Sequence, residues 1–326
     1  MSFFNIGLQE RLSLLGKDHY LAKIQKLVDW KSIEKLLHNH LPKSHLGRDG
    51  YNPLKMLKAI LLGQWHSLSD PALEEALCVR LDFIAFTQLE IGDPLPDETT
   101  LCRFRNRLIQ AGIHEKIFFL INAQLLEKGI IIQQSEGAVV DATLISSSCH
   151  PRKQIDCDEN AQEVKYSADE DARWLVKGSH KHFGYKGFVR TNKEQGFIEK
   201  LHVTSANVAE VNELPKIISD VEGRTVYGDK GYPSQANADL LKAQGCRNGV
   251  MAKATRGHPL TFWQKQRNKA ISKRRYIVEQ VFGTLKRKFC FGRASYRGRE
   301  KVEAQLYFKA ICFNLLKAHR SVEIAA

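Results

Sequence analysis

The chain lacks the features that mark secreted, disulfide-linked and membrane-spanning proteins. Its cysteines number seven in 326 residues, and none forms a C-x-x-C pair, which fits a reducing compartment better than a disulfide framework. No stretch approaches the run of about 20 apolar residues that a membrane-spanning helix needs. The first residues, Met1–Ile6, lack the basic-then-apolar order of a signal peptide. We therefore expect a soluble intracellular protein with no membrane partner.

Acidic residues are scarce in one part of the chain. Residues 251–300 carry 14 Lys and Arg against 2 Asp and Glu, a surplus of 12, whereas residues 1–135 are nearly balanced at 16 against 15. Nearly all of the net charge of +13 therefore lies in one stretch. Because basic side chains bind polyanions by displacing counterions from phosphates, this stretch predicts a nucleic-acid partner. A surface that only aids solubility is the alternative, although such surfaces usually mix both signs.

Residues 1–135 have the hydrophobic spacing of helices. Apolar positions recur at helical intervals over residues 20–40 and from residue 53 onward. Asp70-Pro71 is typical of a helix start, and further helices are expected over residues 98–110 and 114–128. The pattern predicts an all-helical domain for DNA binding or oligomerisation.

Part of this region, residues 70–110, is compatible with a helix-turn-helix. In that interpretation Arg103, Arg105 and Arg107 would face DNA. A helix used for packing or dimerisation is the alternative.

Residues 136–326 change to an α/β pattern. Helical patterns at Asn207–Val221 and Gln235–Gln244 separate the later members of a series of β-rich runs, namely Ala138–Ile145, Gly184–Thr191, Gly196–Thr204, Gly223–Gly228 and Gly249–Ala252. Three strands followed by alternating helix and strand predict a mixed sheet with helices on its faces. Residues 146–182 are polar and without clear period, so we expect a long loop or a partly disordered insertion there.

Three acidic residues stand where metal-dependent phosphoryl transfer would use them. Asp141 closes the apolar run 138–140, Asp229 follows 225–228, and Glu279 lies in a stretch with helical spacing. We expect both aspartates at strand ends, the usual place for an open α/β site. Two such carboxylates and a third on a late helix can hold two divalent metals for in-line attack on a phosphodiester. A cap or turn role for each aspartate is the alternative.

The helix that carries Glu279 has two distinct faces. Arg275, Glu279 and Lys286 fall within roughly 40° of one another around the helix axis. The apolar residues lie on a different face: Ile277, Val278, Val281, Leu285 and Phe289. One face can therefore pack on a sheet while the other presents a carboxylate for metal and two cations for a DNA backbone. An ordinary surface ion pair between Arg275 and Glu279 is the alternative.

Several segments together carry a family resemblance. They are VVDATLI at 139–145, HFGYKGFV at 182–189, VYGDKGY at 226–232, RYIVEQVFGTLKR at 275–287 and LPDETTLCRFRNRL at 95–108. In this order they resemble bacterial insertion-sequence transposases of the DDE type, in the group that includes the insertion-sequence-four and insertion-sequence-five families. The resemblance is closest to the insertion-sequence-five type and covers most of the chain.

The resemblance implies a fold and a catalytic triad. The fold is an α/β ribonuclease-H-like mixed-sheet core, preceded by the helical N-terminal domain, and the metal triad is Asp141, Asp229 and Glu279. The family signature around the glutamate, Tyr-x2-Arg-x3-Glu-x6-Lys, is matched at its Arg, Glu and Lys positions, whereas Ser272 occupies the tyrosine position. Candidate DNA contacts are Arg275, Lys286, Arg274, Lys273, Lys230, Lys186 and Arg287.

The resemblance also implies the reaction and its partners. Two Mg²⁺ ions, for which Mn²⁺ can substitute, would serve water attack at the element end and then attack of the freed 3′-hydroxyl on target DNA. The partners would be double-stranded DNA, as terminal inverted repeats and as target, with a homodimer or larger oligomer in the DNA complex. The expected location is the bacterial cytoplasm, in association with the nucleoid.

Two other functions remain open from the sequence. One is a metal-dependent nuclease that hydrolyses DNA without joining it, and the other is an inactive or repurposed copy that only binds DNA. A zinc site is a weaker alternative, because the spacing of its candidate ligands matches no common zinc site: Cys149, His150, Cys157, His180 and His182.

Overall fold

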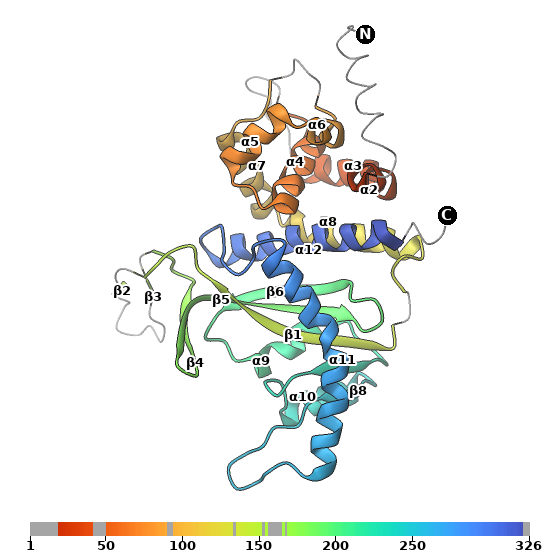
Figure 1. Ribbon diagram of the computed structural model, residues 1–326, viewed down its shortest axis with the longest axis vertical. Coiled ribbons are helices and arrows are strands. Elements are labelled where there is room, and N and C mark those ends of the chain that lie inside the picture. Colours follow the sequence, from red (N-terminus) through yellow and green to blue (C-terminus); the bar gives the residue numbers. More distant parts are fainter. Residues whose placement is uncertain are drawn as a thin grey trace. The chain divides into compact units, whose positions relative to one another are not determined.

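A computed structural model describes residues 19–41, 50–89, 94–132, 135–151, 154–155, 165–166 and 168–321. They divide into two compact units (Figure 1). Unit 1 contains the described residues up to Ile130 together with those from Tyr307 onward, and unit 2 is Ile131–Leu306. The division at Ile130 lies close to the expected boundary at residue 135. The C-terminal residues from Tyr307, which we expected in the α/β domain, group instead with the N-terminal helices.

Unit 1 is built from helices in its described part. They are α2 (Tyr20–Leu27), α3 (Trp30–His40), α4 (Pro53–His66), α5 (Asp70–Val79), α6 (Leu81–Thr87), α7 (Glu98–Gln110) and α8 (Ile113–Glu127). Helix α4 begins where the Asn52 side chain accepts hydrogen bonds from the Leu54 and Lys55 amides, with Pro53 at the first helical position. Eleven of its residues are buried, so α4 forms the centre of this unit.

The last helix explains why the C-terminal residues join unit 1. Helix α12 (Arg299–Ser321) was not anticipated from the sequence. Its Cys312 carbonyl accepts a hydrogen bond from Trp65 Nε1 at 2.9 Å, and Tyr307 Oη bonds Glu115 Oε1 at 3.1 Å. Because Phe308, Ile311 and Leu315 are fully buried, removal of their apolar surface from water stabilises this arrangement.

Unit 2 contains a six-stranded mixed sheet. Its strands are β1 (Gly137–Ser146), β4 (Arg173–Lys177), β5 (His180–Asn192), β6 (Ile198–Ser205), β7 (Thr225–Gly228) and β8 (Arg247–Val250). The order is β4-β5-β1-β7-β8, and β6 also pairs with β5. Strand β1 is antiparallel to β5 but parallel to β7, which in turn is parallel to β8. The mixed sheet predicted from the alternation of strand and helix patterns is confirmed.

Helices cover both faces of this sheet (Figure 1). They are α9 (Glu210–Ile217), α10 (Gln235–Ala243) and α11 (Phe262–Arg287). Val140 of β1 packs in one cluster with Leu214 of α9 and Leu241 of α10. The next residue, Asp141, bonds to Arg275 of α11. Because successive strand residues point to opposite faces, α9 and α10 cover one face and α11 the other. Across the described ranges, no helix combines the length and apolar composition needed to cross a bilayer.

The stretch expected to be a loop, residues 146–182, contains strands. Arg173–Lys177 pairs with the start of β5 across a two-residue turn, Gly178-Ser179, in which Gly178 has a φ of 63°. A positive φ suits the tight turns that join two antiparallel strands. Two short strands, β2 (Gln154–Ile155) and β3 (Lys165–Tyr166), also pair with each other. The prediction overlooked the β-rich run at 173–177; residues 152–153, 156–164 and 167 lie outside the described residues.

Candidate active site

We expected Asp141 at the end of a strand. It lies instead within β1, because β1 continues to Ser146. The last pair between β1 and β7 is Val139 with Tyr227, whereas pairing with β5 continues on the other side. Asp141 therefore lies just beyond the place where β1 stops pairing with β7 while it still pairs with β5. In a parallel sheet such a divergence is where ligand sites are found.

Asp229 follows β7 directly and lies next to Asp141. Both aspartates are two residues beyond the last β1–β7 pair, on strands that run in the same direction. The charge of Asp229 acts on Asp141 strongly enough to contribute to its raised pKa. Asp229 Oδ1 accepts a hydrogen bond from the Gly231 amide at 2.6 Å, which fixes the carboxylate at the start of the turn. The structure thus brings the two predicted aspartates together.

Arg275 binds the Asp141 carboxylate. Its Nη2 donates to Asp141 Oδ2 at 2.6 Å, and the two side chains are only 11% and 13% exposed. Burial nevertheless raises the pKa of Asp141 to about 6, against the lowering effects of Arg275 and of the Ala142 amide. The carboxylate is therefore short of positive charge even with its partner in place.

Glu279 lies one helical turn after Arg275 on α11, about 6 Å further along the helix axis. It is exposed, whereas Val278, Val281 and Leu285 form the buried face of that helix. Within the described residues, no group of three or more His, Cys, Asp or Glu side chains could hold a metal ion. The structure therefore joins Asp141 and Asp229 but does not gather Glu279 with them. Mg²⁺ is commonly held by one or two carboxylates and completed by water and phosphate, so the aspartate pair suits that ion.

Sequence reasoning missed a third carboxylate near this pair, Glu210. It is the first residue of α9, and a Cβ atom on Gly231 would lie within 3.0 Å of both Glu210 Oε2 and Asp229 Oδ1. The other oxygen, Oε1, is 3.6 Å from Lys186 Nζ. An acidic residue at a helix start is so common that it gives little signal of function.

Lys186, a candidate DNA contact, is buried on β5. Only 6% of the residue is exposed, and its Nζ donates to the Val208 carbonyl at 2.8 Å. Lys186 therefore forms an ion pair with Glu210 inside the protein. A side chain that contacts DNA would need its charge in solvent.

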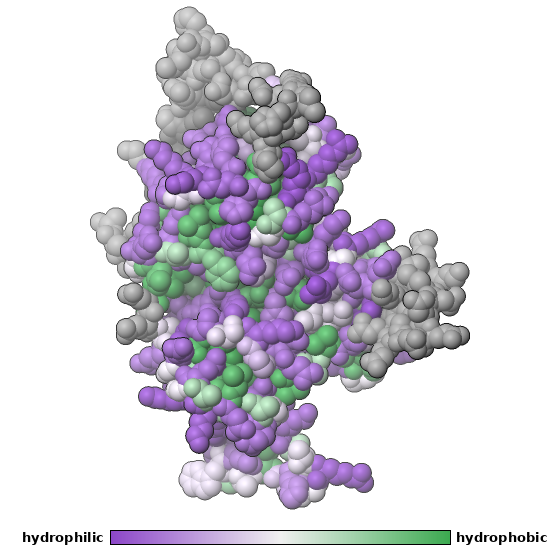
Figure 2. Space-filling model, turned by 180° about the vertical axis from the view of Figure 1, so that it is seen from behind, coloured by the Kyte–Doolittle hydropathy of each residue, from purple (hydrophilic) through white to green (hydrophobic). Residues whose placement is uncertain are grey.

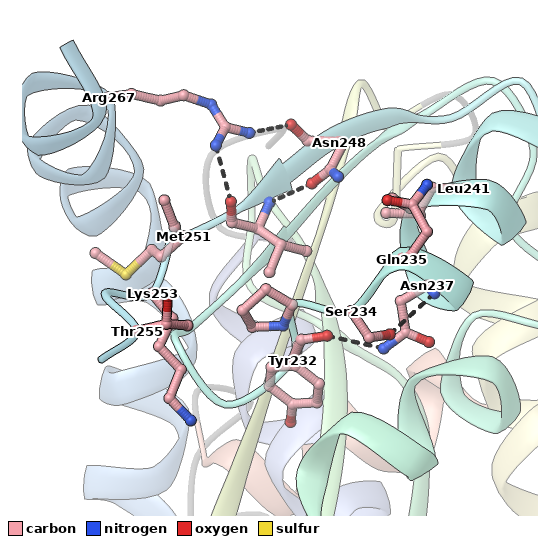
Figure 3. A pocket seen from close by; sticks show the side chains of 14 residues that line it. Tyr232, Ser234, Gln235, Asn237, Leu241, Asn248, Met251, Lys253, Thr255 and Arg267 are labelled. Carbon is pink, nitrogen blue, oxygen red and sulfur yellow. Dashed lines mark hydrogen bonds between the residues drawn. The ribbon is translucent and has the colours of Figure 1, made fainter. Parts of the chain in front are cut away.

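A cavity of about 370 Å³ lies between the start of α10, the end of β8 and α11, and Tyr232 is one of its lining residues (Figure 3). Arg267 closes one side by donating to the carbonyls of Asn248 and Val250 at 2.6 and 3.1 Å. Tyr232 lies at the edge of this cavity with its hydroxyl pointing away from Asn237 and Asn248 (Figure 3). That hydroxyl is buried and has no hydrogen-bond partner in the described structure. Burial, and then the charges of Asp141, Glu210 and Asp229, raise the pKa of Tyr232 well above its usual range.

Comparison with known families decides the identity of the chain. The model of the transposase DDE domain matches residues 132–315, more than half of the chain. The chain belongs to the transposase DDE domain family. A second model, transposase domain (DUF772), matches residues 9–107. The resemblance inferred from the motifs is therefore confirmed, and this transposase is an enzyme that acts on DNA.

A similar curated protein agrees with that assignment. The transposase for insertion sequence element IS1106 of Neisseria meningitidis serogroup B is 46% identical over 221 residues, which are 66% of this chain and 76% of that protein. Among solved structures, a piggyBac transposase synaptic complex with hairpin DNA has a TM-score of 0.49 at 12% identity, over 95% of this chain and 77% of that one.

The remaining candidate DNA contacts of the transposase are exposed. Lys230 follows Asp229, and the others lie along α11: Lys273, Arg274, Lys286 and Arg287. Partial desolvation of this otherwise exposed side chain, and then the nearby charge of Lys177, lower the pKa of Lys286, so two cations approach each other there. Figure 2 shows hydrophilic side chains beside near-neutral ones at the end of unit 2 formed by the loop before α11 and its first turns, where Phe262 and Trp263 are also exposed. A surface of this kind suits a phosphate backbone.

The N-terminal candidates separate into two groups. Arg105 is buried and bonds both carboxylate oxygens of Asp70 at 2.7 and 2.8 Å, so the expectation that it faces DNA is wrong. Arg103 and Arg107 are exposed on the same helix, α7. The helix-turn-helix interpretation stays a prediction, since residues 90–93 lie outside the described residues. Of the residues considered for zinc, Cys157 also lies outside them.

Proposed function

We propose that the transposase cuts the ends of its own element and joins them to target DNA at a site formed by Asp141, Asp229 and Glu279 in a ribonuclease-H-like core. The observation that carries this proposal is the juxtaposition of Asp141 and Asp229 where β1 and β7 diverge. Helix α11 packs on both of these strands and carries Arg275, bonded to Asp141, one turn before Glu279.

The carboxylates would bind two Mg²⁺ ions, or Mn²⁺ in their place. Ions held there would supply activation of water and of a 3′-hydroxyl, and stabilisation of the leaving oxygen. Arg275 orients the Asp141 carboxylate through its 2.6 Å bond. The same guanidinium has the planar arrangement of donors that matches phosphate oxygens, so it can hold the DNA backbone when Asp141 binds metal.

Glu279 would complete the site from α11. Its exposed side chain is free of the apolar contacts that fix its neighbour Val278. Because α11 is packed on β1 and β7, the Glu279 carboxylate remains within one helical turn of the contact between Arg275 and Asp141. A rotamer change costs far less than moving a helix, which is compatible with a third carboxylate that joins when metal and DNA bind.

The exposed cations of α11 and Lys230 would position double-stranded DNA over these carboxylates, because phosphate contacts fix register without reading sequence. The DNA substrates would be the terminal inverted repeats of the element and the target. We propose a homodimer or larger oligomer in the DNA complex, since two element ends have to be held together, and a cytoplasmic location.

Cleavage of a supercoiled plasmid that carries the gene with its own flanking DNA tests this proposal. Wild-type protein with Mg²⁺ or Mn²⁺ should cut at discrete flanking positions, whereas Glu279→Gln and Asp141→Asn should not. Glu300→Gln, which changes an exposed glutamate on α12, should cut like the wild type. If Glu279→Gln cuts normally, Glu279 is not a catalytic residue. Pre-cut ends that are never joined to target DNA would instead indicate a nuclease.

A further inference from the structure

Glu210 and Asp229 approach each other beside Gly231, which has no side chain. A Cβ at Gly231 would lie within 3.0 Å of an oxygen from each carboxylate, so those two oxygens lie close to a common point. Gly231 also donates its amide to Asp229 Oδ1 at 2.6 Å. Its lack of a side chain is therefore what allows the two carboxylates to approach.

The two oxygens of Glu210 have different surroundings. Oε1 is the atom 3.6 Å from Lys186 Nζ, and Lys186 also donates to the Val208 carbonyl. Oε2 is the atom beside Asp229. Arg275 forms its ion pair with Asp141. Two carboxylates that face each other in this way repel unless a cation lies between them.

A buried polar group without a partner lies close to these carboxylates. The Tyr232 hydroxyl is fully buried, has no partner among the described residues and feels the charges of Asp141, Glu210 and Asp229. A buried hydroxyl without a hydrogen bond is costly. Groups that donate hydrogen bonds to metal-bound carboxylates or waters commonly surround metal sites, where they orient the ligands.

We infer that Glu210 is a further metal-binding carboxylate of the transposase, and that it shares one divalent cation with Asp229. The inference rests on the proposed function, because Asp229 belongs both to the proposed catalytic site and to this metal site. Two carboxylates completed by water and phosphate are a usual Mg²⁺ environment. Tyr232 then hydrogen-bonds to a carboxylate or a water of that site, and Gly231 keeps the space between the two ligands open.

Binding of Mn²⁺ alone to the DNA-free full-length chain, followed by electron paramagnetic resonance, tests this assignment. Glu210→Gln should weaken Mn²⁺ binding by about 10- to 100-fold, as loss of a metal-site group typically does. Gly231→Ala should weaken it similarly, because the added methyl collides with both carboxylates. Glu222→Gln, an exposed glutamate in the same unit, should bind Mn²⁺ like the wild type. Wild-type affinity in Glu210→Gln would overturn the assignment.

Lys186→Met distinguishes two roles for Glu210: binding the metal ion, or only holding Lys186 in an ion pair. It removes the ion pair and leaves the Glu210 carboxylate in place. If Glu210 binds the ion, Lys186→Met should keep wild-type Mn²⁺ affinity or exceed it. If Lys186→Met loses Mn²⁺ binding as Glu210→Gln does, Glu210 acts only through that ion pair and the inference is wrong. Circular dichroism of each variant establishes that it is folded.

Asp229→Asn distinguishes failure of this inference from failure of the proposed function. Loss of Mn²⁺ binding in Asp229→Asn with wild-type binding in Glu210→Gln would reject the role of Glu210 and leave the proposed site intact. Wild-type binding in both variants, or absence of Mn²⁺ binding to the wild type, would reject both proposals.

Discussion

Replacement of Asp141 by Asn should stabilise the metal-free transposase while abolishing DNA cleavage. Burial raises the pKa of Asp141 from 3.8 to about 6 although Arg275 is bound to it. A shift of this size corresponds to about 3 kcal/mol, at about 1.4 kcal/mol per pKa unit. That is the cost of keeping the carboxylate ionised in the folded protein near neutral pH. Asn is close in shape to the protonated acid and avoids the cost.

The pH dependence follows from the direction of the shift. Because the pKa of Asp141 is higher in the folded protein than in the unfolded chain, the folded state binds more protons between 3.8 and about 6. Stability of the wild type therefore falls as pH rises through this window and stays lower above it. The difference between Asp141→Asn and wild type should be close to zero below about pH 4 and reach at most about 3 kcal/mol at about pH 8.

Urea unfolding in the presence of a chelator, at a series of pH values, measures this difference. Hydrogen exchange of the β1 amides gives the local free energy, which is needed because two units can unfold separately. Asp239→Asn, at an exposed position on α10, is the matched control and should stay within about 0.5 kcal/mol of the wild type. An Asp141→Asn protein that is less stable than the wild type at about pH 8, or a difference that does not change with pH, would refute the argument.

Three further predictions concern the ion pair of Arg105 in unit 1, the backbone at Gly184 in unit 2 and the DNA interface. Arg105→Met should destabilise unit 1 by on the order of 3 kcal/mol, because it leaves the Asp70 carboxylate without its bidentate partner; thermal melting should show a clear loss, whereas the exposed Arg103→Ala should melt like the wild type. Gly184→Ala should prevent folding of unit 2, because its Cβ would lie within 3.0 Å of the Ile145 carbonyl oxygen and the Ser147 amide nitrogen. Gly292→Ala, where nothing lies within 4 Å, should stay soluble, and equal solubility of the two variants would contradict this reasoning. Lys273→Ala combined with Arg274→Ala should weaken DNA binding uniformly across sequences and reduce the slope of log K against log salt by about 2; an unchanged slope would place the phosphate contacts elsewhere.

Local patterns predicted most elements of both units. Helical spacing identified α7 and α8 nearly to the residue, and the β-rich runs identified the strands that became β1, β5, β6, β7 and β8. The errors have physical causes. The α12 residues are hydrophobic on a face that is buried only through helices distant in sequence, and the β4–β5 hairpin lies in a stretch dominated by polar residues. Arg105 is a basic residue of the kind that contacts DNA, but it is buried and forms an ion pair with Asp70.

The sequence alone determined the family, the mixed α/β class of unit 2 and the residues on which the candidate site depends. These are properties of local pattern and of motif, and they need no knowledge of how segments meet. Only the tertiary structure decided that Asp141 lies in mid-strand, that Arg275 binds it and that Glu210 reaches Asp229 from the other side. Each of those facts depends on strand register and on helix packing. Pairing of strands far apart in the chain, and not the spacing of residues along it, determines which charges become neighbours.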